Sequence, residues 1–276
     1  MNDRLAEIRA EGLLAEGRPV VVLFSGGRDS TCLLDFATRI AGPSAVQALH
    51  INYGLRPGDS DDDERHCGAV TAALGVALEI RRVGPAERPD RGNLQAWARQ
   101  WRYAAASELA RPSGADVAAG HTATDQVETI LYRLASSPSR RALLGMRARD
   151  GILIRPLLAL TRADTAAYCR ERSLTWREDA SNESDAYARN RIRHQLVPAL
   201  NAVHPAAEGN VLALAEILRQ EAAVLDELVD DVLAGRDEIS VERLRGLAPA
   251  LRRLVVQRLA DAAAGRPAAG VARRAD

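Results

Sequence analysis

The stretch that decides the fold reads Pro19-Val20-Val21-Val22-Leu23-Phe24-Ser25-Gly26-Gly27-Arg28-Asp29-Ser30. Its first half is a continuous β-branched and apolar run, the pattern of a strand buried on both faces of a sheet. An amphipathic helix follows, from Ser30 to about Ile40. The glycine pair lets the backbone turn tightly and approach a phosphate closely. The start of the following helix offers that anion unpaired N–H groups and the positive end of the helix dipole.

Asp29 narrows the choice of ligand for this loop. A carboxylate beside phosphates is repulsive unless a divalent cation lies between them. The loop therefore predicts ATP with Mg²⁺, with Asp29 as a metal ligand. The alternative is an ordinary strand-to-helix turn, in which glycine pairs are common. The predicted ATP-binding residues are Ser25, Gly26, Gly27, Arg28, Asp29 and Ser30.

Outward from the loop, strand and helix patterns alternate. Further strands are expected at Val46–Ile51, Ala77–Arg82 and Asp116–Ala119, with a helix at Leu94–Ala110. This alternation predicts an α/β fold with a doubly wound parallel sheet. After about residue 145 we expect a strand at Ile152–Leu158 and helices at Thr161–Arg172, Ala206–Leu233 and Pro249–Ala262. The predicted domains are a catalytic domain over residues 1–203 and a smaller helical domain over residues 204–276.

Composition excludes several classes of protein. The 37 basic and 37 acidic residues balance, so a nucleic-acid site has to be a local patch. Every basic residue is arginine, which excludes a GxxxxGK[ST] phosphate loop and a pyridoxal Schiff base. Cys32, Cys67 and Cys169 form no CxxC pair, so no disulfide framework or zinc ribbon is expected. Without a signal segment or a long apolar run, the sequence predicts a soluble, cytoplasmic protein with no membrane contact.

Four further motifs lie between residues 50 and 200. They are His50-Ile51-Asn52-Tyr53-Gly54-Leu55-Arg56, Ala98-Arg99-Gln100-Trp101-Arg102-Tyr103, His121-Thr122-Ala123-Thr124-Asp125-Gln126-Val127-Glu128-Thr129, and Trp176–Asn182 with Tyr187–Arg193. The Phe24–Ser30 run resembles the SGGxDS signature of PP-loop ATP pyrophosphatases. The ordered set resembles the tRNA(Ile)-lysidine synthases of that superfamily.

This resemblance implies an ATP-dependent ligase that adenylates the C2 oxygen of the wobble cytidine in a CAU-anticodon tRNA(Ile). The ε-amine of free L-lysine then replaces AMP. The resemblance places lysine at His121, Asp125 and Glu128, with Asp125 as a second metal ligand. Asp125 and Glu128 lie three residues apart at a predicted helix start, so they share one face and could hold Mg²⁺ or an alkylammonium. Acidic residues are also favoured at any helix N-terminus.

Arginines gather in the second half of the same region. Residues 140–193 contain 12 Arg against 7 Asp and Glu, a local excess that suits a phosphate backbone. We predict tRNA contacts at Arg189, Asn190, Arg191 and Arg193 and across the helical domain. Arg102 and Arg193 are the candidates for stabilising developing negative charge. A solvated arginine face is the alternative for this cluster, and a snorkelling helix arginine is the alternative for Arg102. A homodimer is left open.

Two departures from the family pattern stand out. Thr124 occupies the place of the first aspartate of HxxDDQxET, and no glycine follows Arg133 until Gly145, where the family carries a glycine-rich turn. Two alternative functions therefore remain. One is a tRNA thiolase that uses Cys67 and Cys169, and the other is a nucleotide- or RNA-binding module without turnover.

Overall fold

The computed structural model describes residues 2–55, 58–84, 87–89, 94–137, 139–178 and 188–265. The chain forms two compact units, Met1–Leu212 and Ala213–Asp276. Arg56 and the part of the predicted motif from Asp179 to Tyr187 lie outside the described residues. Among the described residues, no helix is both long and apolar enough to cross a membrane.

A six-stranded sheet forms the centre of the first unit, in the order β3-β2-β1-β4-β6-β5. The strands are β1 (Val20–Leu23), β2 (Val46–Asn52), β3 (Ala77–Arg82), β4 (Asp116–Ala118), β5 (Arg149–Asp150) and β6 (Leu153–Ile154). The pairs from β3 across to β6 are all parallel, as predicted. The edge strand β5 pairs antiparallel with β6, which the sequence did not predict.

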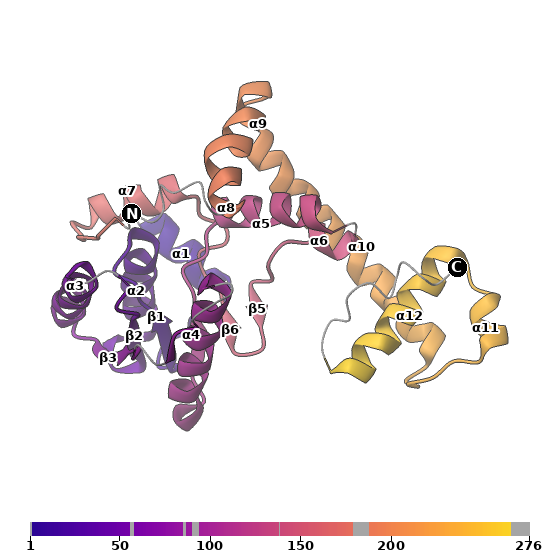
Figure 1. Cartoon of the computed structure of the whole chain (residues 1–276), viewed down its shortest axis with the longest axis horizontal. Coiled ribbons are helices and arrows are strands. Elements are labelled where there is room, and N and C mark those ends of the chain that lie inside the picture. The colour runs from indigo at the N-terminus through magenta and orange to yellow at the C-terminus, as the bar shows by residue number, and fades with distance from the viewer. Residues whose placement is uncertain are drawn as a thin grey trace. The chain divides into compact units, whose positions relative to one another are not determined.

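Helices cover both faces of this sheet (Figure 1). The four helices α1 (Asn2–Ala10), α2 (Arg28–Ala41), α3 (Asp59–Leu74) and α7 (Arg162–Glu171) contribute to the core on one face, and α4 (Leu94–Ala110) covers the other. Strand β1 is buried on both sides, because Val20 and Val22 pack into the first core while Val21 and Leu23 pack into the second. The doubly wound α/β architecture is thereby confirmed.

The remaining helices of the first unit follow β4 and α7. They are α5 (Ala123–Ser136), α6 (Arg140–Leu143), α8 (Ala188–Arg191), the π-helical turn η5 (Ile192–Leu196) and α9 (Val197–Val203), with short 3₁₀ turns at Pro43–Ala45 and Arg111–Ser113. A small core of Val127, Leu131, Ile192 and Val197 joins α5 to η5 and α9. This core brings two segments of the predicted site together.

The second unit is helical. Its elements are most of α10 (Ala207–Leu233), α11 (Val241–Arg245) and α12 (Pro249–Ala264). Val229, Leu233 and Val255 form the buried centre of this unit. The predicted tRNA contact of residues 204–276 stays a prediction.

Two predicted elements are shorter in the structure. The sequence pattern at Leu5–Glu16 predicts a short amphipathic helix, whereas α1 ends at Ala10 because Gly12 turns the chain with φ +68°. The strand expected at Ile152–Leu158 is reduced to β6, since Pro156 has no N–H to donate to a neighbouring strand.

Gly120 sets the distance between β4 and the start of α2. A Cβ on Gly120 would lie 3.2 Å from the backbone carbon and oxygen of Asp29 and 3.3 Å from the nitrogen of Ser30. Only a residue without a side chain allows the end of β4 to approach the glycine-pair loop this closely.

We expect Gly120→Ala to destabilise the protein by about 1–3 kcal/mol, because the new methyl group meets backbone that cannot move independently. Urea unfolding checks this. The control is Gly68→Ala in α3, where a Cβ meets nothing within 4 Å and the change should stabilise by about 0.5–1 kcal/mol. Equal effects of the two substitutions would contradict the steric argument.

Candidate active site

The Ser25–Ser30 loop leaves the start of α2 open. Gly27 is the N-cap residue, and no side chain caps the helix. Ser30 Oγ donates to Gly27 O at 2.9 Å and lies 3.1 Å from Ser25 Oγ, so the two hydroxyls stand together at the helix start. Gly26 has φ +79°, and a Cβ there would lie 3.0 Å from Cys67 Sγ. The first N–H groups of α2 are therefore presented to an anion.

Asp29 is held on the loop by a residue that the sequence analysis missed. Thr165, buried in α7, donates its hydroxyl to Asp29 Oδ1 at 2.5 Å. Arg28 Nε donates to the same oxygen at 3.0 Å and lies 3.2 Å from the Thr165 hydroxyl. Asp29 thus has a fixed orientation beside the open helix end, although its partner is 136 residues away in the sequence.

Asp125 and Glu128 are buried together at the start of α5, with 6% and 0% of their surface exposed. Three arginines surround them. Arg189 donates to Glu128 at 2.8 Å and to Asp125 at 3.1 Å, and Arg193 donates to Glu128 at 2.6 Å. Arg162 donates to Asp125 at 3.0 Å. We call these five residues the arginine–carboxylate cluster. Three guanidinium groups against two carboxylates give it a formal charge of +1.

Asp125, the third residue of α5, also takes part in the cap of this helix. Its Oδ2 accepts from the backbone N–H of Thr122 at 2.8 Å, while the Thr122 hydroxyl accepts from the Asp125 N–H. This capping box satisfies two backbone donors at the start of α5. Burial alone would raise the pKa of Asp125, but Arg162, Arg189 and the Thr122 N–H outweigh it and hold the pKa below its usual value. Asp125 is therefore ionised at neutral pH.

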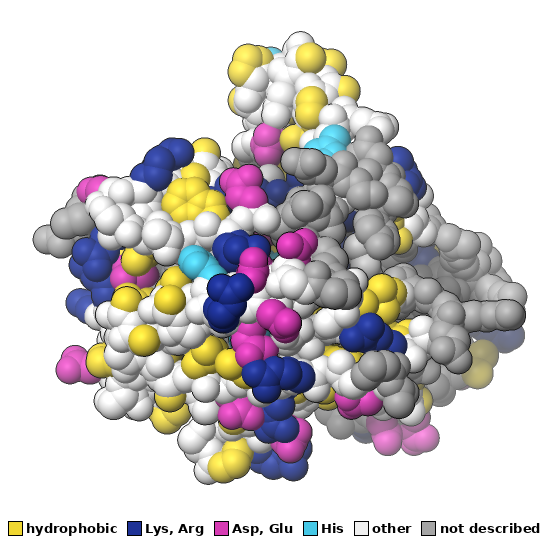
Figure 2. Space-filling view, turned by 60° about the vertical axis from the view of Figure 1, so that its left-hand side comes forward, with side chains coloured by type: hydrophobic (Ala, Val, Ile, Leu, Met, Phe, Trp, Pro, Cys, Tyr) yellow, Lys and Arg dark blue, Asp and Glu magenta, His cyan; other side chains and the backbone are white. Residues whose placement is uncertain are grey.

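Only some of the residues predicted to contact tRNA or to stabilise charge lie in the arginine–carboxylate cluster. Arg189 and Arg193 point into the cluster, whereas Arg191 is exposed and Asn190 is buried. Arg102 is exposed on α4, and its Nε donates to Tyr53 Oη at 3.3 Å rather than to a member of the cluster. On the face drawn in Figure 2, arginine and acidic side chains are interleaved. Their assignments to tRNA and to charge stabilisation stay predictions.

His121 follows β4 and precedes the cap of α5. Its Nδ1 is buried and has no hydrogen-bond partner among the described residues. Burial lowers the pKa of His121 to about 4, against the smaller opposing effect of Asp125, so the ring is neutral at pH 7. A neutral ring beside Asp125 can accept or donate a hydrogen bond to a ligand, as the predicted lysine role requires.

Comparison with known proteins places this geometry in a family. A PP-loop domain model matches residues 1–200. The chain belongs to the PP-loop domain family. Membership implies that the chain binds ATP, which agrees with the open helix start behind the glycine pair.

Relatives of this PP-loop chain are named tRNA(Ile)-lysidine synthases. One from Dehalococcoides mccartyi is 34% identical over 95% of this chain and 60% of its own length. One from Solibacter usitatus is 36% identical over 92% of this chain and 59% of its own length, and one from Thermus thermophilus is 38% identical over 93% and 51%. The chain thus spans between about half and three fifths of the length of these relatives.

A solved structure shares the fold. The U34-tRNA thiolase NcsA from Methanococcus maripaludis, solved with its [4Fe-4S] cluster, matches with a TM-score of 0.65 at 15% identity, over 79% of this chain and 78% of that one. In this PP-loop chain all three cysteines are buried and free. Burial raises the pKa of the Cys67 thiol to about 12, whereas a hydrogen bond with Cys32 lowers the pKa of Cys169. Both thiols are buried, so neither has the exposed setting of a reactive thiol.

Asp29 fits a Mg²⁺ ion bound between the PP-loop and ATP. Such an ion takes one or two protein carboxylates and completes its coordination with phosphate oxygens and water. Among the described residues no group of three or more His, Cys, Asp or Glu is arranged to hold a metal by itself. Asp125 fits less well, because its Oδ1 accepts from Arg162 at 3.0 Å and Arg189 at 3.1 Å and its Oδ2 accepts from the Thr122 N–H at 2.8 Å. Asp29 Oδ2 has longer contacts, to Arg28 Nη2 at 3.4 Å and Arg162 Nε at 3.7 Å.

The departure at Thr124 also has a structural counterpart. Thr124 Oγ1 accepts a hydrogen bond from the backbone N–H of Arg162 at 3.2 Å, so it joins α5 to the first turn of α7. A neutral hydroxyl in place of a third carboxylate leaves the arginine–carboxylate cluster with its positive excess.

His121 predicts a pH dependence of stability. Its pKa is 6.5 in the unfolded chain and about 4 in the folded one, so between these values only the unfolded state takes up the proton. Stability should therefore fall by about 2–3 kcal/mol as the pH drops from 6.5 to 4. Urea unfolding at pH 7 and pH 4.5 checks this against His121→Asn, in which that part of the loss should disappear. Parallel profiles for the two proteins would contradict it.

Proposed function

We propose that this protein is an ATP-dependent tRNA(Ile)-lysidine synthase of the cytoplasm. It would adenylate the C2 oxygen of the wobble cytidine in CAU-anticodon tRNA(Ile) and then attach free L-lysine there. The observation that carries the proposal is the placement of two sites side by side. An uncapped helix start for phosphates adjoins a buried carboxylate pair suited to an ammonium group, and Arg162 and Thr165 of α7 connect them. The names of the relatives support the same activity.

The chemistry has two steps. The C2 oxygen of cytidine attacks the α-phosphorus of ATP, the bond to the bridging oxygen breaks, and pyrophosphate leaves. The ε-amine of lysine then attacks C2, loses a proton, and AMP leaves with the C2 oxygen. When bound, Mg²⁺ supplies charge neutralisation between Asp29 and the phosphates. Ser25, Ser30 and the N–H groups at the start of α2 orient the phosphates.

The lysine side chain is assigned to Asp125, Glu128 and His121. An ammonium group leaves water at acceptable cost only where carboxylates replace its hydration, and Glu128 is fully buried. The arginines of the arginine–carboxylate cluster have to give up some of their hydrogen bonds to these carboxylates when lysine binds. Arg102 and Arg193 are proposed to stabilise negative charge on the adenylated cytidine, and Arg189, Asn190 and Arg191 to contact the tRNA together with the helical unit.

The decisive experiment follows pyrophosphate, AMP and labelled lysine separately. With ATP, Mg²⁺ and CAU-anticodon tRNA, we expect AMP release and labelling of the tRNA to require lysine. Asp29→Ala should lower AMP release and tRNA labelling at least about a hundredfold, because the carboxylate that would hold Mg²⁺ beside the phosphates is lost. Glu171→Ala, which removes an exposed carboxylate at the last residue of α7, is the matched control outside the proposed site. An Asp29→Ala protein with wild-type activity would refute the assignment of the metal site.

Two further functions are distinguished by the same assay. Retained tRNA labelling in a Cys32→Ser/Cys67→Ser/Cys169→Ser protein is expected, and it excludes a thiolase that depends on Cys67 and Cys169. A loss of labelling in this variant, with its thermal unfolding unchanged, would contradict that expectation. Tight ATP binding without pyrophosphate release, with tRNA and lysine both present, would favour a nucleotide-binding module without turnover.

A further inference from the structure

Arg162 faces three carboxylates with its three different nitrogens. Its Nη2 lies 3.0 Å from Asp125 Oδ1, its Nη1 lies 3.7 Å from Glu128 Oε1, and its Nε lies 3.7 Å from Asp29 Oδ2. Asp125 and Glu128 belong to the proposed lysine site, and Asp29 belongs to the ATP loop. A single guanidinium group thus stands between the two halves of the site.

The position of Arg162 is set by its backbone and not only by these ion pairs. It is the first residue of α7, directly after the N-cap Thr161, whose side chain accepts from the Asp164 N–H. Its own N–H donates to Thr124 Oγ1 at 3.2 Å. One turn further on, Thr165 donates to Asp29. The first turn of α7 is therefore anchored at both α5 and the loop, and the side chain of Arg162 lies between these anchors.

The contacts of Arg162 are unequal. The Nη2 contact is a hydrogen bond, whereas Nε is buried and makes no hydrogen bond to any residue that the structure describes, so its interaction with Asp29 is a longer-range ion pair. A guanidinium group with one unsatisfied buried N–H has more to gain from a new anion on its Asp29 side. The phosphates of ATP would bring such an anion to the loop.

We propose that Arg162 is a positioning residue that couples nucleotide binding to the opening of the lysine site. ATP draws Arg162 toward the loop, which loosens its hold on Asp125 and Glu128. These carboxylates then become available to the ammonium group of lysine. Nucleotide therefore binds first and lysine second. This inference rests on the proposed function, since it assumes ATP at the loop and lysine at the carboxylate pair.

The test measures lysine binding by calorimetry on the full chain, with and without α,β-methylene-ATP and Mg²⁺. In the wild type we expect the analogue to lower the Kd for lysine at least about fivefold. In Arg162→Gln the cluster has permanently lost one cation. Its Kd for lysine without nucleotide should match that of the nucleotide-bound wild type, and the analogue should add nothing. Arg162→Lys keeps the charge but not the three-nitrogen geometry, so it should also lose the coupling.

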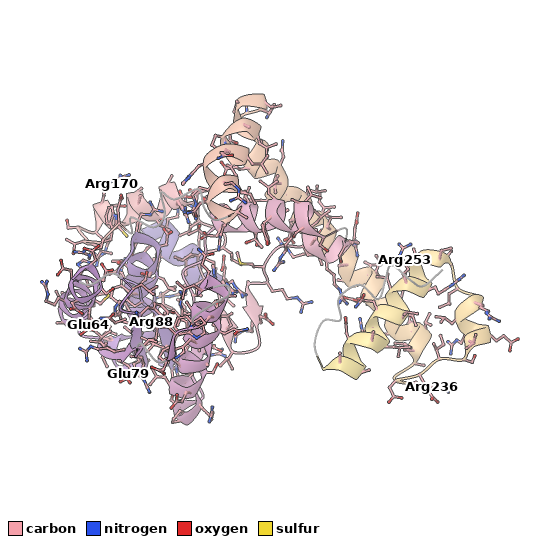
Figure 3. All side chains as sticks on the ribbon, in the orientation of Figure 1. Glu64, Glu79, Arg88, Arg170, Arg236 and Arg253 are labelled. Carbon is pink, nitrogen blue, oxygen red and sulfur yellow. The ribbon has the colours of Figure 1, made fainter. Side chains whose placement is uncertain are left out.

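The matched control is Arg170→Gln. Arg170 is an exposed arginine of the same helix, two turns after Arg162, and is labelled in Figure 3. It should keep the wild-type ratio of the two lysine Kd values. Thermal unfolding of each variant shows whether the protein remains folded. A wild-type ratio of one, or an unchanged ratio in both Arg162 variants, would overturn the proposal.

Failure of the proposed function is recognised separately. If lysine binds to no form of the protein, the choice of lysine as substrate is wrong, and affinity for the nucleotide analogue alone then decides the role of Arg162. In the otherwise wild-type protein, we expect Glu128→Gln to change the affinity for the nucleotide analogue at least about threefold. In the Arg162→Gln background the same substitution should have no effect. An equal effect of Glu128→Gln in both backgrounds would contradict the proposed coupling between the two sites.

Discussion

The need to neutralise two buried carboxylates organises the functional end of this molecule. Asp125 and Glu128 occupy the first turn of α5, where Glu128 has no exposed surface. An isolated carboxylate in such a place costs several kcal/mol, and the cost falls only when cations with good hydrogen-bond geometry surround it. The chain meets this requirement with arginines from α7, α8 and η5. The positions of these elements around α5 therefore depend on charge as well as on the apolar contacts of Val127 and Ile192.

The sheet supplies the second half of the site by simpler means. Strand β1 is buried on both faces, and the chain leaves it through a loop in which Gly26 turns the backbone with φ +79° and packs closely against Cys67 and His66. The neighbouring strand β4 ends at Ala118, and Gly120 in the loop that follows approaches the backbone of Asp29 and Ser30 closely. In doubly wound sheets, ligands bind at the carboxyl ends of the parallel strands, where the loops after adjacent strands lie together. The arginine–carboxylate cluster begins directly after this point.

Sequence patterns were sufficient for what depends on local structure. The β-branched run at Val20–Leu23 and the helix at Leu94–Ala110 carry their periodicity in neighbouring residues, so both could be predicted. The loop could be predicted as well, because the serines and Asp29 are adjacent to the glycine pair. The sequence did not predict η5 or α9. Their apolar residues are few, and the contribution of these residues is clear only from their packing against α5. Strand β6 was predicted, but as the longer stretch Ile152–Leu158, whereas the two-residue strand β5 is too short to carry a pattern.

Long-range partners could not be predicted in the same way. Thr165 and Arg162 look like ordinary residues of a capped helix, and nothing near them in the sequence points to Asp29 or Asp125. Arg189 and Arg193 were noticed as a basic cluster, but the sequence could not tell a surface patch from cations turned inward. The deciding information was the packing of α5, α7 and η5, which depends on tertiary contacts.

The separation of Asp29 from Thr165 also has a consequence for the protein during its synthesis. The loop leaves the ribosome early, but the residue that orients its carboxylate follows 136 residues later. At about 5–20 residues per second, this delay is roughly 7–27 s. During that interval β1 and α2 can form, yet Asp29 lacks the hydroxyl that fixes it and Asp125 lacks all three of its arginines. A nascent chain that ends before Thr165 would bind nucleotide weakly. The complete site therefore forms only in the finished domain, and nucleotide binding marks a late stage of its folding.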